Sequence, residues 1–129
     1  MKKNRGFTLI EILIVMVVIG ILAAIAIPSY NNQLIRGTRA SAQAAMMDAA
    51  NKELFYLQAT RGYSSSYSDL NVSLPVEVTN FYTMTIVTDN TATPPTFTLT
   101  ATPIAGTRQA SDGNLTLDHN GTKSPAGKW

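Results

Sequence analysis

The fold of this chain is decided by RGFTLIEILIVMVVIGILAAIAI, residues 5–27. After Gly6 the stretch is apolar except at Thr8, Gly20 and one carboxylate, Glu11. A helix of about 20 residues, rising about 1.5 Å per residue, spans about 30 Å, which is the thickness of the hydrocarbon core of a bilayer. The stretch therefore predicts a membrane-spanning helix that contains one residue, Glu11, whose charge is energetically unfavourable in lipid.

Glu11 is the group that needs a partner. A carboxylate inside a membrane helix costs about 2.5 to 3.5 kcal/mol on insertion scales, so it must be paired, neutralised or drawn toward the interface. If the chain were cut after Gly6, the new amine of Phe7 would place a positive charge four residues before Glu11. In a helical array that amine can belong to a neighbouring copy. The other interpretation is a signal anchor that carries a stray acidic residue.

The motif around these residues is similar to a known one. Lys3-Asn4-Arg5-Gly6, followed by Phe7-Thr8-Leu9-Ile10-Glu11 and an apolar helix, resembles the leader and N-terminal segment of type IV prepilins and related pseudopilins. The resemblance implies cleavage after Gly6 by an inner-membrane prepilin peptidase, N-methylation of Phe7, and a Glu11 that neutralises the Phe7 amine of an adjacent subunit during assembly. It divides the chain into three parts: a cleaved leader (1–6), a transmembrane and assembly helix (7–28), and a periplasmic or extracellular globular pilin domain (29–129).

The net charge of the chain indicates its membrane topology more than its binding partners. The chain has 129 residues, which suits one small domain with an appendage, and its formal charge is +2. Three of its ten basic residues, Lys2, Lys3 and Arg5, lie in the predicted leader; without them seven basic residues face eight acidic ones, a charge near −1. Cationic residues before an apolar helix hold its N-terminus in the cytoplasm, which predicts a single pass through the inner membrane.

Beyond Ile27 the helical pattern continues in amphipathic form. Pro28 is expected to kink or interrupt the helix, because it lacks an amide donor and its ring crowds the carbonyl group of Ala24. Apolar residues nevertheless resume on one helical face, at Leu34, Ala42, Ala45, Ala49, Leu54 and Leu57, with Met46 and Ala50 beside them. Polar residues fall on other faces, at Arg36, Arg39, Gln43, Lys52 and Glu53. The sequence predicts one helix from Phe7 to about Ala59.

The remainder of the chain predicts a small antiparallel sheet. A turn-rich stretch at 60–69 is expected to leave the helix as an exposed loop, with Gly62 as a left-handed stop. Apolar residues then alternate from Leu70 to Val78, which with Pro75 favours an extended segment at a sheet edge. Clean alternation predicts strands over 82–87, 96–102 and 115–117, with a hairpin loop at 89–95 and a tight turn at Asn120-Gly121.

The apolar faces of these strands and of the 34–57 helix complement one another. The predicted fold class is α+β, with a long N-terminal helix whose first half spans the membrane and whose amphipathic second half packs on the antiparallel sheet. The resemblance to type IV pilins implies the same fold.

Catalytic and metal-binding motifs are not evident in the sequence. The chain has no cysteine and one histidine, His119, which is best explained as a polar residue of the hairpin Asp118-His119-Asn120-Gly121. Asp112 and Asp118 lack the dense, regularly spaced oxygen ligands of a calcium loop. We therefore expect no enzymatic activity, no metal and no cofactor.

DNA binding is a more specific alternative function than catalysis or metal binding. From about Arg36 onward the order of elements, with Phe97-Thr98-Leu99-Thr100 and Gly113-Asn114-Leu115-Thr116-Leu117, is similar to minor pilins of the PilE and ComP-like group. Some members of that group are receptors for DNA during natural transformation. The candidate phosphate contacts are the cations Arg108, Lys123 and Lys128. The opposing interpretation, which the charge near −1 favours, is that these are solvated surface residues.

The absence of cysteine predicts a compensating contact. PilE-like pilins commonly carry one cysteine just before the Gly-x-Leu-Thr-Leu strand and another just before a terminal Trp, and those places hold Asp112 and Lys128 in this chain. We expect this pair to close the C-terminal loop without a covalent bond. An exposed ion pair contributes only about 0 to 1 kcal/mol, against about 2 to 4 for a disulfide, so packing by Trp129 must help.

Together these observations predict a structural subunit of a type IV pilus, and a minor pilin rather than the major one. Its partners would be inner-membrane lipid before assembly, the prepilin peptidase, the inner-membrane assembly platform, and then major and minor pilin subunits of an extracellular pilus used for adhesion, twitching motility or DNA uptake. Gly20 and Pro28 bracket a stretch that, by resemblance to assembled pili, loses helicity in the filament. The alternatives are a type II secretion pseudopilin, a major pilin and a pilus-borne DNA receptor.

Overall fold

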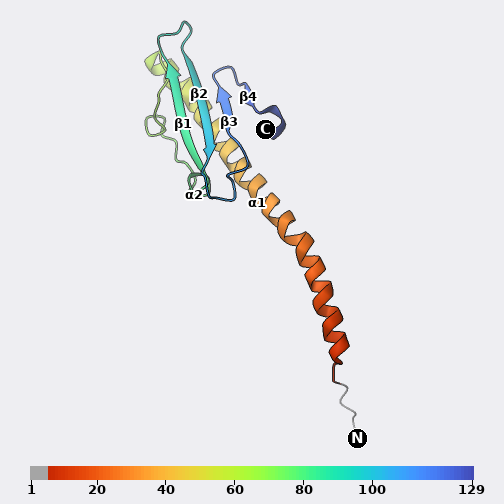
Figure 1. Ribbon diagram of the computed structural model, residues 1–129. Coiled ribbons are helices and arrows are strands. Elements are labelled where there is room, and N and C mark those ends of the chain that lie inside the picture. The colour runs from red at the N-terminus through yellow and green to blue at the C-terminus, as the bar shows by residue number, and fades with distance from the viewer. Residues whose placement is uncertain (1–5) are drawn as a thin grey trace. The chain divides into compact units, whose positions relative to one another are not determined.

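One long helix comes first in the chain, and a small antiparallel sheet follows it (Figure 1). The computed structural model describes residues 6–129. The helix, α1 (Leu9–Thr60), passes through Pro28 without ending. Its predicted bounds, Phe7 and Ala59, are correct to within two residues.

The chain forms two compact units, residues 1–34 and residues 35–129, and α1 contributes to both. In the first unit every large apolar side chain from Leu9 to Ile27 is between 48% and 80% exposed. By length and composition this part of α1 can cross a membrane, as the sequence predicts. The predicted leader, apart from Gly6, lies outside the described residues.

The second unit contains a four-stranded antiparallel sheet in the order β1-β2-β3-β4. Its strands are β1 (Tyr82–Asp89), β2 (Thr96–Pro103), β3 (Leu115–Asp118) and β4 (Lys123–Ser124). The first three confirm the predicted strands to within two residues, because apolar and polar side chains alternate there except at Ile86-Val87. β4 and the short 3-10 helix η1 (Ala126–Lys128) lie in a segment for which the sequence makes no prediction.

The core of the second unit lies between α1 and one face of the sheet. Figure 1 shows the strands in front of the second half of α1. Ala42, Met46 and Ala49 of α1 are each 0% exposed. They belong to one cluster with residues of three strands, namely Tyr82, Ile86, Phe97, Leu99, Ala101, Leu115 and Leu117. Every member of this cluster lies within residues 35–129, so this unit has its own core.

The segment that precedes β1 differs from its prediction. Leu70 to Val78 was expected to be extended at a sheet edge, but it forms a turn and then the four-residue helix α2 (Val76–Thr79). Pro75 explains the difference, since its φ of −60° suits the residue before a helix and its carbonyl accepts the N–H of Val78 at 2.9 Å. Leu70, Val72 and Val78 are buried on this non-strand backbone, whereas Val76 is 69% exposed.

The loop after α1 is less exposed than predicted, since Tyr63 and Ser64 are buried. The left-handed residue that ends the helix is Arg61, with φ 64°, and not Gly62. A Cβ on Gly62 would lie 3.1 Å from Cγ of Asn90, whose side chain accepts the Tyr63 N–H at 2.8 Å and donates to the Tyr63 carbonyl at 2.9 Å. Gly62 is therefore needed for the close approach that ties this loop to the β1–β2 hairpin.

Two neighbouring residues of α1 contradict the predicted helical faces. Leu54, expected in the core, is 46% exposed, and Glu53, expected in solvent, is 0% exposed. The reason for the second difference is a partner outside the helix, because the backbone N–H of Ser64 donates to Oε2 of Glu53 at 3.0 Å. Periodicity alone does not reveal such a partner.

Candidate functional site

The start of α1 is organised by Thr8 and Glu11. The Glu11 N–H donates to Oγ1 of Thr8 at 3.3 Å, and the Thr8 N–H donates to Oε2 of Glu11 at 3.4 Å. This reciprocal pair is a capping box, which satisfies amide groups that would otherwise lack partners at the helix start. Glu11 thus has a local role that our sequence analysis missed, although the spacing Thr8-x-x-Glu11 is the known signature of such a box.

The other residues predicted for processing and assembly lie open on the first unit. Phe7 is 80% exposed, and a Cβ at Gly6 or Gly20 would meet no other atom within 4 Å. Pro28 is also exposed, in the middle of the continuous helix. These positions are accessible, and their roles in cleavage, methylation and filament stretching stay predictions.

Asp112 is the centre of a buried polar cluster in the second unit, where it is 4% exposed. Arg39 of α1 binds its carboxylate with two groups: Nε donates to Oδ2 at 2.9 Å, and Nη2 donates to Oδ1. The Tyr82 hydroxyl of β1 donates to Oδ2, and Nε2 of Gln109 donates to the same oxygen at 2.9 Å. The helix, the first strand and the loop before β3 therefore meet at one carboxylate.

The Tyr82 hydroxyl is protonated at neutral pH and so can donate to Asp112. Burial raises the pKa of Tyr82, and the hydrogen bond from Gln109 and the charge of Arg39 only partly oppose this rise. Gln109 itself is 0% exposed, and its Nε2 also lies 3.1 Å from the carbonyl oxygen of Ile35. Gln109 thus lies buried between Asp112, Tyr82 and the backbone of α1.

The structure places the predicted pair of Asp112 and Lys128 side by side. Nζ of Lys128 lies 3.7 Å from Oδ1 of Asp112, a longer and more exposed contact than the two bonds from Arg39. Arg39 is therefore the principal cation at this carboxylate, a contact that its predicted place off the apolar face of the helix did not reveal. That the pair closes the C-terminal loop stays a prediction.

The end of the chain has further contacts of its own. Nε2 of Gln43 on α1 donates to the carbonyl of Lys128 at 2.6 Å. The Trp129 indole N–H donates to the carbonyl of Ser124 at 3.1 Å, and the ring packs against the core cluster. These contacts act beside Asp112 in holding the last residues to the domain.

Each of the three cations considered for DNA binding has a partner within the chain. The Arg108 guanidinium lies 4.0 Å from the ring centroid of Phe81 and donates to Oγ1 of Thr38 at 3.1 Å. Nζ of Lys123 lies 5.1 Å from the ring centroid of Trp129. Arg108 and Lys123 remain exposed, whereas Lys128 is partly buried beside Asp112.

Glu53 is a second buried carboxylate, and it anchors the loop after α1. In the described part of the chain its Oε1 has no hydrogen-bond partner. Burial raises the pKa of Glu53, and the Ser64 N–H opposes this rise. Burial and the charge of Glu53 raise the pKa of Tyr67 to about 12. Both groups therefore favour their neutral forms.

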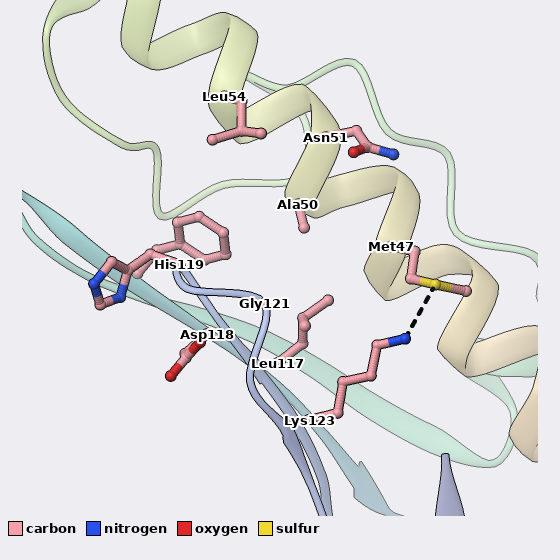
Figure 2. A pocket seen from close by; sticks show the side chains of 10 residues that line it. Met47, Ala50, Asn51, Leu54, Leu117, Asp118, His119, Gly121 and Lys123 are labelled. Carbon is pink, nitrogen blue, oxygen red and sulfur yellow. Dashed lines mark hydrogen bonds between the residues drawn. The ribbon is translucent and has the colours of Figure 1, made fainter.

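A groove of about 270 Å³ lies between α1 and the β3–β4 hairpin (Figure 2). It is lined by Met47, Ala50, Asn51 and Leu54 of α1 and by Phe97, Leu117, Asp118, His119, Gly121 and Lys123 of the sheet and hairpin. The His119 ring lies 6.5 Å from that of Phe97, on the predicted tight turn, where Gly121 has φ 77°. Among residues 6–129, no three His, Cys, Asp or Glu side chains gather closely enough to hold a metal ion.

Two family models match this sequence. The model described as "Type IV minor pilin ComP, DNA uptake sequence receptor" matches residues 28–116, which is more than half of the chain. The model described as "Prokaryotic N-terminal methylation motif" matches residues 1–27.

Curated relatives and a solved structure are each similar to part of the chain. A fimbrial protein of Pseudomonas aeruginosa is 50% identical over 52 residues, 39% of this chain and 34% of that protein. A type IV major alpha-pilin of Moraxella bovis is 47% identical over 58 residues, 43% of this chain and 36% of that protein. The chain thus matches about a third of the length of these relatives. A type IV pilin of Shewanella oneidensis superposes with a TM-score of 0.54 at 28% identity, covering 71% of this chain and 92% of that one.

Proposed function

Because the chain belongs to the family of the type IV minor pilin ComP, a family of pilus subunits, we propose that it enters the pilus as a minor subunit and that its N-terminal helix drives assembly. The family consists of structural proteins, and we assign no catalysed reaction to this chain. Its mechanism is polymerisation through residues 7–28.

The exposed apolar surface of α1 from Leu9 to Ile27 is the observation that carries this proposal. The core of the second unit does not use this apolar surface, because every member of its hydrophobic cluster lies within residues 35–129. An apolar helix without a protein partner must be covered by lipid or by other helices. We infer that it lies first in the inner membrane, with its N-terminus in the cytoplasm, and later packs among equivalent helices in an extracellular filament.

The second unit carries a face of small, uncharged residues on its own part of α1. Gly37, Ala40 and Ala44 are exposed and are spaced by three and four residues, so they lie on one side of the helix. Small residues in this arrangement allow a second helix to approach closely. This face extends the surface that we propose for packing between subunits.

Glu11 and the Phe7 amine are the proposed electrostatic contact between subunits. In the capping box, Oε2 of Glu11 already accepts the Thr8 N–H of its own helix. Cleavage after Gly6 by a prepilin peptidase would remove the leader and create the amine that a neighbouring Glu11 neutralises. The helix therefore keeps its shape in lipid and gains a charge partner only after assembly.

Mixed expression of two tagged copies tests the pairing. Copies with Glu11→Ala should enter sheared filaments several-fold less efficiently than wild-type copies made in the same cells. Glu77→Ala, an exposed glutamate of α2, is the matched control and should enter normally. Equal entry of the Glu11→Ala copies would show that the charge pairing is not needed.

Processing is tested by the mass of the chain recovered from filaments. The recovered chain should lack Met1 to Gly6 and carry one additional methyl group at Phe7. A chain that retains its leader in filaments would contradict the proposed processing. The abundance of the chain relative to other pilins in the same filaments distinguishes a minor from a major subunit.

DNA binding is a second candidate function, which the ComP family match over residues 28–116 favours. Arg108 is the cation we expect to contact phosphate, since it is exposed and held in place by Phe81 and Thr38. Titration of the full chain in detergent with duplex DNA at two salt concentrations tests this, because phosphate binding weakens as salt rises.

Two variants separate a specific contact from general charge. Arg108→Gln should reduce the salt dependence by about one phosphate contact. Lys52→Gln, which removes a cation paired with Asp48 on α1, should leave binding unchanged. Binding that is insensitive to salt, or equally sensitive to both changes, would exclude Arg108 as a phosphate contact.

A further inference from the structure

We propose that the loop between β2 and β3, residues 104–114, is a clamp that stops uncoiling of α1 at Ile35. The clamp acts through Arg108, Gln109 and Asp112, which contact α1 where it enters the second unit. The inference rests on the proposed function only for its purpose, since a pilus subunit is pulled through its N-terminal helix. The contacts themselves lie within one unit of a single chain.

The side of α1 that packs on the sheet continues beyond the hydrophobic core. Among residues 6–129, the hydrophobic cluster contains no α1 residue before Ala42. Thr38 is nevertheless only 6% exposed, and Ile35 and Arg39 are partly buried. These residues precede Ala42 by four, seven and three positions, so all of them lie on the same side of the helix. A part of the chain other than the hydrophobic core therefore covers this stretch of α1.

The clamp provides that cover through side-chain contacts. Nη2 of Arg108 donates to Oγ1 of Thr38 at 3.1 Å. Nε2 of Gln109, which is 0% exposed, lies 3.1 Å from the carbonyl oxygen of Ile35. Both contacts join positions at least 70 residues apart in the sequence. The clamp thus holds both a side chain and the backbone of the helix.

The clamp is also fixed to the sheet and cannot simply follow the helix. Asp112 accepts a hydrogen bond from Nε of Arg39 at 2.9 Å and another from the Tyr82 hydroxyl of β1. The Arg108 guanidinium lies 4.0 Å from the ring centroid of Phe81, the residue before β1. Moving this part of α1 away from the sheet would therefore break contacts on both sides of the loop.

These contacts define where uncoiling should stop. In an α-helix the carbonyl of Ile35 accepts the N–H of Arg39, and here Gln109 approaches the same oxygen. Opening that turn would cost the clamp contacts in addition to the helical hydrogen bond. Earlier turns are less protected, because Pro28 provides no N–H and residues 29–33 are all exposed. The boundary between easily opened and clamped helix therefore lies at Ile35.

Such a stop would protect the second unit when a filament is pulled. Uncoiling lengthens a helix from about 1.5 Å to about 3.4 Å per residue, so it lets the chain extend under load. The stretch between Gly20 and Pro28 is predicted to lose helicity in the filament. With a stop at Ile35, this loss does not spread to Ala42, where the hydrophobic core of the second unit begins.

Amide hydrogen exchange of the full chain in detergent tests the position of the stop. We expect the amides of residues 39–41 to exchange at least about tenfold more slowly than those of residues 29–33. Thr38→Val removes the hydroxyl that Arg108 binds and should speed exchange at 39–41 by up to about tenfold, with no change at 46–50. The matched control is Thr60→Val, which removes a hydroxyl at the other end of α1 and should leave 39–41 unchanged.

A double-mutant cycle identifies the contact responsible. Arg108→Met keeps an unbranched side chain but removes the donor to Thr38, so it should also speed exchange at 39–41. Because both changes remove the same hydrogen bond, Thr38→Val should add less acceleration in the Arg108→Met background than in the wild type. Fully additive effects would show that Arg108 and Thr38 do not act through one contact, which would overturn the clamp.

Two other outcomes would overturn the proposal. Unchanged exchange at 39–41 in Thr38→Val would mean that the hydrophobic core alone holds the helix. Equal acceleration at 39–41 and at Leu99 of β2 would mean that the contacts stabilise the whole unit and do not act locally. None of these measurements uses filaments, so a wrong clamp leaves the proposed pilus role intact, and absence of the chain from filaments leaves the clamp intact.

Discussion

Asp112 accepts hydrogen bonds from side chains that belong to α1, to β1 and to the loop before β3. A carboxylate with this degree of burial is stable only when its charge is paired and its oxygens are satisfied. Arg39 provides both, with Lys128 at a greater distance. The residue that most affects the C-terminal region is therefore Asp112, and its two cations should not be equivalent.

The difference between the two cations is measurable. Asp112→Ala leaves the Arg39 guanidinium partly buried without its anion, so we expect the free energy of unfolding to fall by about 3 to 5 kcal/mol. Lys128→Ala removes only a distant, partly exposed contact and should cost about 0 to 1 kcal/mol. Denaturant midpoints of the full chain in detergent measure both, with Asp48→Ala as a surface control. Equal losses for Asp112→Ala and Lys128→Ala would contradict this order.

Glu53 gives a pH-dependent prediction. Burial raises its folded-state pKa above the usual 4.5, so the protonated form adds stability at low pH that is lost as pH rises through the folded-state pKa. Glu53→Gln stays neutral and keeps an oxygen for the Ser64 N–H. We expect this variant to have a higher denaturant midpoint than the wild type at pH 7 and the same midpoint below about pH 4.

An exposed glutamate serves as the control for this titration. Glu77→Gln on α2 should leave the midpoint unchanged at both pH values. If Glu53→Gln were less stable than the wild type at pH 7, the ionised carboxylate would be required by the loop that contains Ser64.

At the scale of elements, the helix–sheet interface depends on one face of α1. Met46 is 0% exposed and its neighbour Met47 is 41% exposed. Met46→Ala removes buried contacts and should lower the free energy of unfolding by about 2 to 5 kcal/mol. Met47→Ala should change it by less than about 0.5 kcal/mol, as is usual for surface residues. Similar losses for the two variants would mean that α1 is packed on a different face.

The elements that could be predicted are those whose pattern is local. Alternation gave β1, β2 and β3, and the apolar run with its amphipathic continuation gave α1. The same alternation gave a wrong prediction of an extended segment for Leu70 to Val78. Pro75 precedes a helix there, although the side-chain pattern fits a strand equally well. Burial followed the hydrophobic pattern at Leu70, Val72 and Val78 but not at Val76, which the helix turns toward solvent.

The candidate site was predictable only in part. Asp112 and Lys128 were found through the positions that cysteines occupy in similar pilins, yet the nearest cation is Arg39, which is 73 residues away in the sequence. Glu53 was missed for a similar reason, since its partner Ser64 lies in a loop. Pairing between distant residues depends on the folded arrangement, which helical periodicity does not contain.

At the scale of the whole molecule, the two units should be separable. The core cluster and the polar cluster at Asp112 lie entirely within residues 35–129. We expect residues 35–129 produced alone to unfold cooperatively and to remain soluble without detergent, whereas the full chain fractionates with membranes. Circular dichroism during urea titration and cell fractionation measure these properties. A gradual transition without a midpoint would show that the first unit is needed for folding.

Closure of the C-terminal region by Asp112, Arg39 and Lys128, which stays a prediction, would make that region indifferent to redox conditions. A domain closed by a disulfide needs an oxidant when it folds, opens when it meets a reductant, and closes again only when it is reoxidised. Here the end of the chain can detach and close again with no change in oxidation state, and dithiothreitol should leave it unaffected.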